Sequence, residues 1–117
     1  MMRTGEWAGA TPMHFAAAHA VMHEEVYGVA VEESRQKSWW LKSAGAAKRL
    51  LAGTFGGDAE ELATYVRWLW TREAEKLRWA EREKIVLRKR LSVWAAYSPS
   101  LVTDWRFSLE RKSRVPR

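Results

Sequence analysis

The sequence contains no cysteine, so it has neither a disulfide framework nor a thiolate metal site. No apolar run approaches the roughly 20 residues that cross a bilayer, and we therefore expect no membrane-spanning segment. Only three prolines interrupt the chain. No stretch shows the alternation of apolar and polar residues typical of strands. These absences predict an all-α, soluble protein, and the lack of cysteine fits a cytoplasmic location.

Motifs that would indicate catalysis are also missing. There is no nucleophile elbow and no Walker loop. The glycine-rich stretch from Gly53 to Gly57 precedes a helix, but it follows another helix and lacks the Lys-Ser/Thr ending of a phosphate-binding loop. It is typical of a helix-to-helix turn. We therefore expect a binding protein without a cofactor, and not an enzyme.

A chain of 117 residues fits one domain. We expect a compact bundle of about four helices, with residues 1–10 as a loose arm and residues 111–117 as a basic tail. Ser, Thr and Asp favour N-caps, Pro the first turn, and Gly the position after the last turn. By these signals the helices begin at Thr11-Pro12, Ser38, Asp58 and Ser98-Pro99, and the first three end at Gly28, Gly53 and about Glu83. The pattern leaves open whether the third helix continues through Ile85 to Arg90.

In each helix, apolar residues recur at steps of three and four and so form one core-facing line. The lines are Phe15, Ala18, His19, Met22 and Val26; Trp40, Ala44, Ala47 and Leu51, flanked by Leu41 and Leu50; Leu62, Tyr65, Val66, Leu69 and Ala80; and Leu101, Val102, Trp105 and Leu109. The tryptophans that lie on or beside these lines are predicted to be core residues: Trp70, Trp94 and Trp105.

Charge is distributed unevenly along the chain. Residues 1–58 carry six basic and six acidic side chains, whereas residues 59–117 carry fourteen basic and eight acidic ones. The whole net charge of +6 therefore lies in the second half. Such asymmetry favours a polyanionic partner.

Tryptophan is unusually frequent, with eight residues. Trp68 and Trp79 are eleven positions apart, so on a helix they share a stripe, and Arg72 lies between them. Aromatic rings interleaved with guanidinium groups are what single-stranded nucleic acid binders use, because bases stack on the rings and phosphates meet the cations. The alternative is that the two rings complete the core, with arginine stems packed over them.

The densest cluster of cations follows this stripe. Phosphates would meet the basic side chains, and the full set of candidate nucleic-acid contacts is Trp68, Arg72, Arg78, Trp79, Arg82, Lys84, Arg88, Lys89 and Arg90. The alternative is a solvated face on which Glu81 and Glu83 act as local partners.

His19 and His23 are four residues apart and so point from one side of a helix, with Glu24 nearby. Two such histidines can hold a metal only if a third ligand comes from elsewhere. We favour a partly buried helix face and predict no metal site.

Several stretches resemble small helical domains carried by bacteriophages, alone or at the end of replication-associated proteins. The stretches are Ala47 to Leu51, Phe55 to Asp58, Leu62 to Trp70, and Tyr97 to Leu101. The resemblance covers residues 12–110. It implies a phage-like origin and a nucleic-acid-processing setting, and it carries over no catalytic residue.

The sequence therefore predicts a nucleic-acid-binding accessory protein that acts in replication, recombination or transcription control. Single-stranded DNA is the favoured partner, and the host cytoplasm is the location if a phage encodes the protein. The alternative is an interaction module that binds a polymerase, packaging or replication protein through the same aromatic and basic surface.

Overall fold

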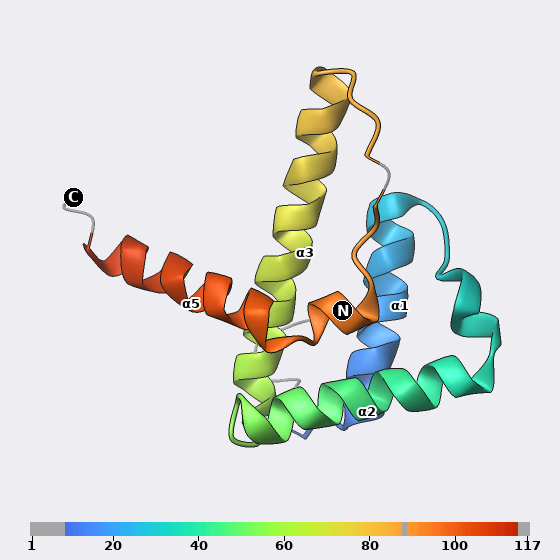
Figure 1. Cartoon of the computed structure of the whole chain (residues 1–117), viewed down its shortest axis with the longest axis vertical. Coiled ribbons are helices and arrows are strands. Elements are labelled where there is room, and N and C mark those ends of the chain that lie inside the picture. Colours follow the sequence, from blue (N-terminus) through green and yellow to red (C-terminus); the bar gives the residue numbers. More distant parts are fainter. Residues whose placement is uncertain (1–8, 88, 115–117) are drawn as a thin grey trace.

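The computed structural model describes residues 9–87 and 89–114 of the chain, with side chains as far as residue 111. Its elements are α1 (Pro12–Tyr27), η1 (Glu32–Arg35), α2 (Lys37–Gly53), α3 (Ala59–Arg82), α4 (Val93–Ala96) and α5 (Pro99–Arg114). No strand occurs among the described residues, which confirms the predicted all-α fold. In Figure 1, α2 crosses the lower ends of α1 and α3, and α5 projects away from the other helices.

Most of the predicted helix boundaries are confirmed, including the end of α2 at Gly53, the end of α3 next to Glu83 and the start of α5 at Pro99. Pro12 occupies the first position of α1, where the Thr11 amide donates to Nδ1 of His14 at 3.0 Å, and Gly28 ends the helix with a left-handed φ of 77°. The Asp58 side chain accepts from the Glu61 amide at 3.1 Å and so caps α3. The predicted turn after α2 is also present.

The start of α2 differs from the prediction, because Gln36 and not Ser38 precedes the helix. The core line is shifted as well: Trp39 is buried, whereas Trp40 is only partly buried. The cause is η1, which leads directly into α2. The Trp40 indole nitrogen donates to the Ser34 carbonyl oxygen of η1 at 2.8 Å, so Trp40 faces η1 and its neighbour takes the core position.

The core line predicted for α3 is confirmed, since Leu62, Tyr65, Val66, Leu69 and Ala80 are all buried. The prediction for the tryptophans holds for two of three, namely Trp70 and Trp105.

Trp94 is not a core residue, because it remains 48% exposed. The short helix α4 buries Val93 and Ala96 instead. The prediction that Leu109 faces the core is also wrong, because Leu109 is exposed. Helix α5 has left the bundle by this position. The predicted basic tail is helical as far as Arg114, while the rest of it and residues 1–8 of the predicted arm lie outside the described residues.

The segment between α3 and α5 returns to the bundle and is held there by three tyrosine hydroxyls. Tyr27 of α1 accepts from the Leu91 amide at 2.8 Å and donates to Glu73 of α3 at 2.7 Å. Tyr65 donates to the carbonyl oxygen of Ala96. Tyr97 donates in the other direction, to the carbonyl oxygen of Phe15 in α1, at 2.6 Å. Burial raises the pKa of all three phenols, which keeps them protonated as donors.

Replacing Tyr27 by Phe should lower the free energy of unfolding by about 1–3 kcal/mol, because the Leu91 amide and the Glu73 carboxylate both lose their partner. Chemical denaturation of Tyr27→Phe, Glu73→Gln and the double variant measures the coupling. Additive effects of the two changes would contradict the proposed connection between α1, α3 and the returning segment.

Candidate nucleic-acid interface

Beyond its contacts with α1, helix α3 continues into a projection. Figure 1 shows the end of α3 extending past α1 and the chain then running back between the two helices. We call residues 75–87 and 89–90 the basic finger. Its described cations are Lys76, Arg78, Arg82, Lys84, Lys89 and Arg90, against three carboxylates, Glu75, Glu81 and Glu83.

The finger reverses direction at Lys84, which adopts a left-handed φ of 56°. The Ile85 amide donates back to the Ala80 carbonyl oxygen at 2.8 Å, in the pattern that usually ends a helix at glycine. A lysine at such a position costs about 1 kcal/mol relative to glycine. The protein thus has a cation at a position where glycine would give a more stable fold.

All six described cations of the finger are exposed. Within the described part of the chain none of them takes part in an ion pair, and the six cations exceed the three carboxylates of the finger by three. Five are predicted contact residues: Arg78, Arg82, Lys84, Lys89 and Arg90. Of the other two basic residues of that prediction, Arg72 lies earlier on α3 and Arg88 lies outside the described residues.

The two rings of the predicted stripe have different environments. Trp68 is partly buried and packs on the core, with its ring stacked on Tyr65 at 6.3 Å between centroids. The Arg72 guanidinium lies 5.3 Å from the same ring. A base could reach Trp68 only by displacing this cation. Trp79 is 45% exposed and is available for stacking.

Trp79 does not face the side of α3 on which α1 lies. Glu73, which contacts Tyr27 of α1, precedes it by six residues. Six residues rotate a helix by 600°, so Trp79 points about 120° away from α1. The structure thus separates Trp68, Arg72 and Trp79 from Arg90, which returns on the α1 side.

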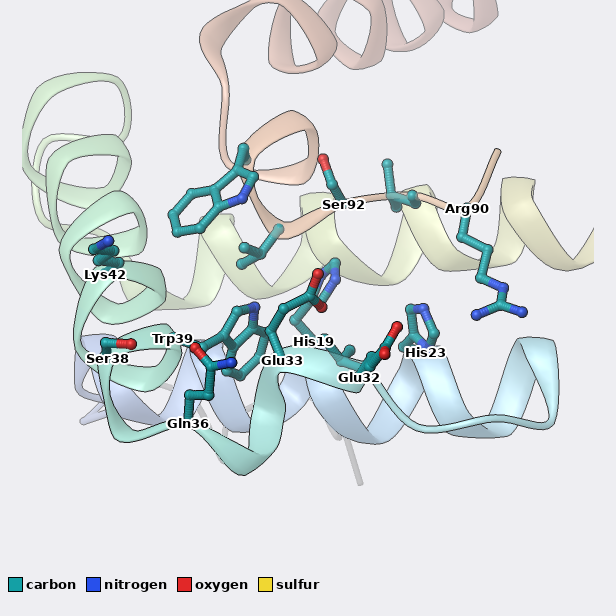
Figure 2. Close-up of a pocket in the computed structure, with 14 residues that line it drawn as sticks. His19, His23, Glu32, Glu33, Gln36, Ser38, Trp39, Lys42, Arg90 and Ser92 are labelled. Carbon is teal, nitrogen blue, oxygen red and sulfur yellow. The ribbon is translucent and has the colours of Figure 1, made fainter. Parts of the chain in front are cut away.

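Arg90 stands at one end of a cleft of about 390 Å³ between α1, η1, α2 and the segment that leads into α4. We call this hollow the cleft (Figure 2). Its lining is mixed in charge and includes two indole rings and two imidazole rings. It consists of His19, His23, Val31, Glu32, Glu33, Gln36, Ser38, Trp39, Lys42, Arg90, Leu91, Ser92, Val93 and Trp94.

A shallower hollow adjoins the cleft and shares Lys42 and Trp94 with it. Its other lining residues are Leu41, Gly45 and Arg49. The exposed ring of Trp94 therefore borders both hollows, with a cation from α2 in each. Sequence reasoning missed these residues, because Lys42 and Arg49 belong to the neutral first half. Trp94 is exposed because α4 has only four residues, too few to bury every apolar side chain, and the sequence carried no signal of that length.

His19 forms the floor of the cleft and is fully buried among rings from three other segments. Trp70 lies edge-on at 5.2 Å, Tyr97 at 6.3 Å and Trp39 at 6.5 Å between centroids. Its Nδ1 has no hydrogen-bond partner among the described residues. Burial, reinforced by His23, lowers the pKa of His19 to about 4, while a hydrogen bond with the Leu91 backbone acts in the opposite direction. The imidazole is neutral at physiological pH.

His23 lies one turn further along α1 and is also buried. Its Nδ1 is 2.8 Å from the carbonyl oxygen of Val29, just beyond the helix end. Among the described residues, no group of three or more potential ligands is placed to hold a metal ion. No described helix combines the length and apolar character that crossing a membrane would require.

Comparison with known proteins yields no relative. No family model, curated protein or solved structure matches the chain. The geometry of the finger and the cleft is therefore the basis for inferring the function of the chain.

Because the folded protein holds His19 neutral, its contribution to stability is complete above the unfolded pKa of about 6.5 and is lost as the pH falls toward 4. The loss amounts to about 3 kcal/mol at pH 4. His19→Phe keeps a ring in the cluster but cannot bind the proton. Urea denaturation between pH 7 and 4.5 should show a free energy of unfolding that falls less steeply in the variant. Parallel curves would contradict a buried neutral histidine.

Proposed function

We propose that the protein binds nucleic acid, with single-stranded DNA as the favoured form, and that the basic finger is the main contact surface. The observation that carries this proposal is the set of six exposed finger cations that form no ion pair with any described residue. Unpaired cations concentrated on a projection raise the local positive potential and attract phosphates.

The exposed ring of Trp79 supports a single-stranded partner. Trp79 lies in the last turn of α3, next to Arg78 and close to Arg82. The phosphates of a base stacked on Trp79 would therefore lie near these two cations. Ring stacking is tolerant of sequence, because every base offers a flat apolar face. Binding of this kind would be strongly dependent on salt and weakly dependent on sequence.

The setting of this activity is a proposal that rests on the resemblance to small helical phage domains. It would be replication, recombination or transcription control in the host cytoplasm. The finger supplies cations for phosphates and the ring of Trp79 for stacking. We therefore propose an accessory binding role without catalysis.

A second candidate function, binding of a protein, is favoured by the end of α5. Arg106 anchors this helix by donating to the Thr54 carbonyl oxygen at 3.1 Å. Beyond that point α5 exposes Phe107 and Leu109, at 60% and 47%. Exposed apolar side chains on a projecting helix suit a groove on a partner protein.

Replacing Arg78, Arg82 and Lys89 by Ala tests the main proposal. Fluorescence anisotropy with a labelled oligothymidylate of about ten nucleotides should show weaker binding and a slope of log K against log salt that is smaller by about 2. The matched control replaces Arg35, Lys37 and Lys48, three exposed cations outside both hollows, with the same change in net charge. Its slope should stay near that of the wild type. Equal effects of the two triple variants, or no binding by the wild type at low salt, would overturn the proposal.

Lys84→Gly provides a sharper test, because it should change stability and binding in opposite directions. Glycine relieves the left-handed strain and should raise the free energy of unfolding by up to about 1 kcal/mol. Loss of the cation should weaken oligonucleotide binding. Lys84→Asn, which also tolerates this conformation, is the control for backbone effects. A variant that is more stable and binds as tightly as the wild type would exclude Lys84 from the interface.

A further inference from the structure

The cleft differs from the finger in its chemistry. The finger is an open surface with an excess of positive charge, whereas the cleft is a concave site with charges of both signs. Its volume of about 390 Å³ lies at the lower end of the range for small-molecule sites. A hollow of this size suits one planar group, and a duplex would not fit in it.

The charges in the cleft are arranged in a definite order. In Figure 2, Lys42 of α2 and Arg90 stand at opposite ends, and Glu32 and Glu33 of η1 lie between them. Phosphates are attracted to the two ends and repelled by the carboxylates in the middle. The middle therefore favours a neutral group that offers N–H donors, flanked on each side by an anion.

The walls of the cleft add a surface for stacking and an acceptor. Trp94 is 48% exposed and borders the cleft, so part of its ring is accessible to a ligand there. The floor is neutral, and Nδ1 of His19 is without a partner among the described residues. The exposed carboxylates of Glu32 and Glu33 are thus the acceptors that a bound group can reach, above a neutral floor.

We infer that the cleft binds a single unpaired guanine base of the strand whose backbone contacts the finger. Guanine offers adjacent N1–H and N2–H donors that one carboxylate can accept together. Adenine and cytosine offer one amino group beside an acceptor, and the single N–H of thymine lies between two carbonyl oxygens that a carboxylate repels. The flanking phosphates would meet Lys42 and Arg90. This inference rests on the proposed nucleic-acid binding and adds base preference to it.

The experiment measures anisotropy with the whole protein and an oligothymidylate of about ten nucleotides, with one central position replaced in turn by dG, dA or dC. The dG strand should bind at least about fivefold more tightly than plain oligothymidylate, as expected for one bidentate contact. Glu32→Gln, Glu33→Gln and Trp94→Ala should reduce this ratio. Glu25→Gln, an exposed carboxylate of α1 outside the cleft, should leave it unchanged.

The outcomes separate this inference from the proposed function. If no strand binds at low salt, the proposed function fails and the guanine site fails with it. If all four strands bind equally, nucleic-acid binding stands and the guanine site is overturned. A dG preference that survives both Gln variants and Trp94→Ala would also overturn it, because the base would then bind elsewhere. Glu33→Gln keeps the test valid even if Trp94→Ala does not fold.

Discussion

The described residues between α3 and α5, 85–87 and 89–97, contain no helix or strand apart from the short α4, and three tyrosine hydroxyls determine where this segment lies. Tyr27 fixes Leu91, Tyr65 fixes Ala96, and Tyr97 fixes its own position against Phe15. These bonds join positions 31 to 82 residues apart in the sequence. A backbone amide or carbonyl buried without such a partner would cost about 1–3 kcal/mol. The finger and the cleft both depend on this attachment, because the same segment forms one side of each.

The neutral imidazole of His19 is the second constraint on the site. Rings from α2, α3 and the end of α4 surround it, so a charge at this point would be poorly solvated. The cleft consequently has a polar but uncharged floor beneath its four charged side chains. A neutral floor does not attract phosphate, so the proposed binding assigns the finger and the cleft to different parts of one strand.

Much of the fold could be predicted from local signals. Helix caps and periodicity located α1 and α3 to within one residue, because Thr11-Pro12, Gly28 and Asp58 act within a single turn. The choice between Trp39 and Trp40 could not be predicted, since it depends on a hydrogen bond to η1. Leu109 looked like a core residue because its position on the helix wheel is correct. The direction in which α5 leaves the bundle determines its exposure, and that direction is a property of the tertiary structure.

The candidate site was predictable only in part. The charge excess and the Trp79 stripe indicated the finger, because both are features of one continuous segment. The cleft combines residues from α1, η1, α2 and the segment before α4, and no single stretch of sequence contains its pattern. Trp68 shows the opposite case: its spacing matched Trp79, yet packing on Tyr65 and the guanidinium of Arg72 give it a different role.

The central claim is that nucleic acid contacts the finger and the cleft while the core stays unchanged. The indole N–H signals of the eight tryptophans in an ¹H–¹⁵N correlation spectrum test it most directly. On titration with an oligothymidylate that carries one dG, the signals of Trp79 and Trp94 should move, and those of the buried Trp70 and Trp105 should stay in place. Movement of Trp70 and Trp105 without Trp79 and Trp94, or no movement of any signal at low salt, would contradict the account.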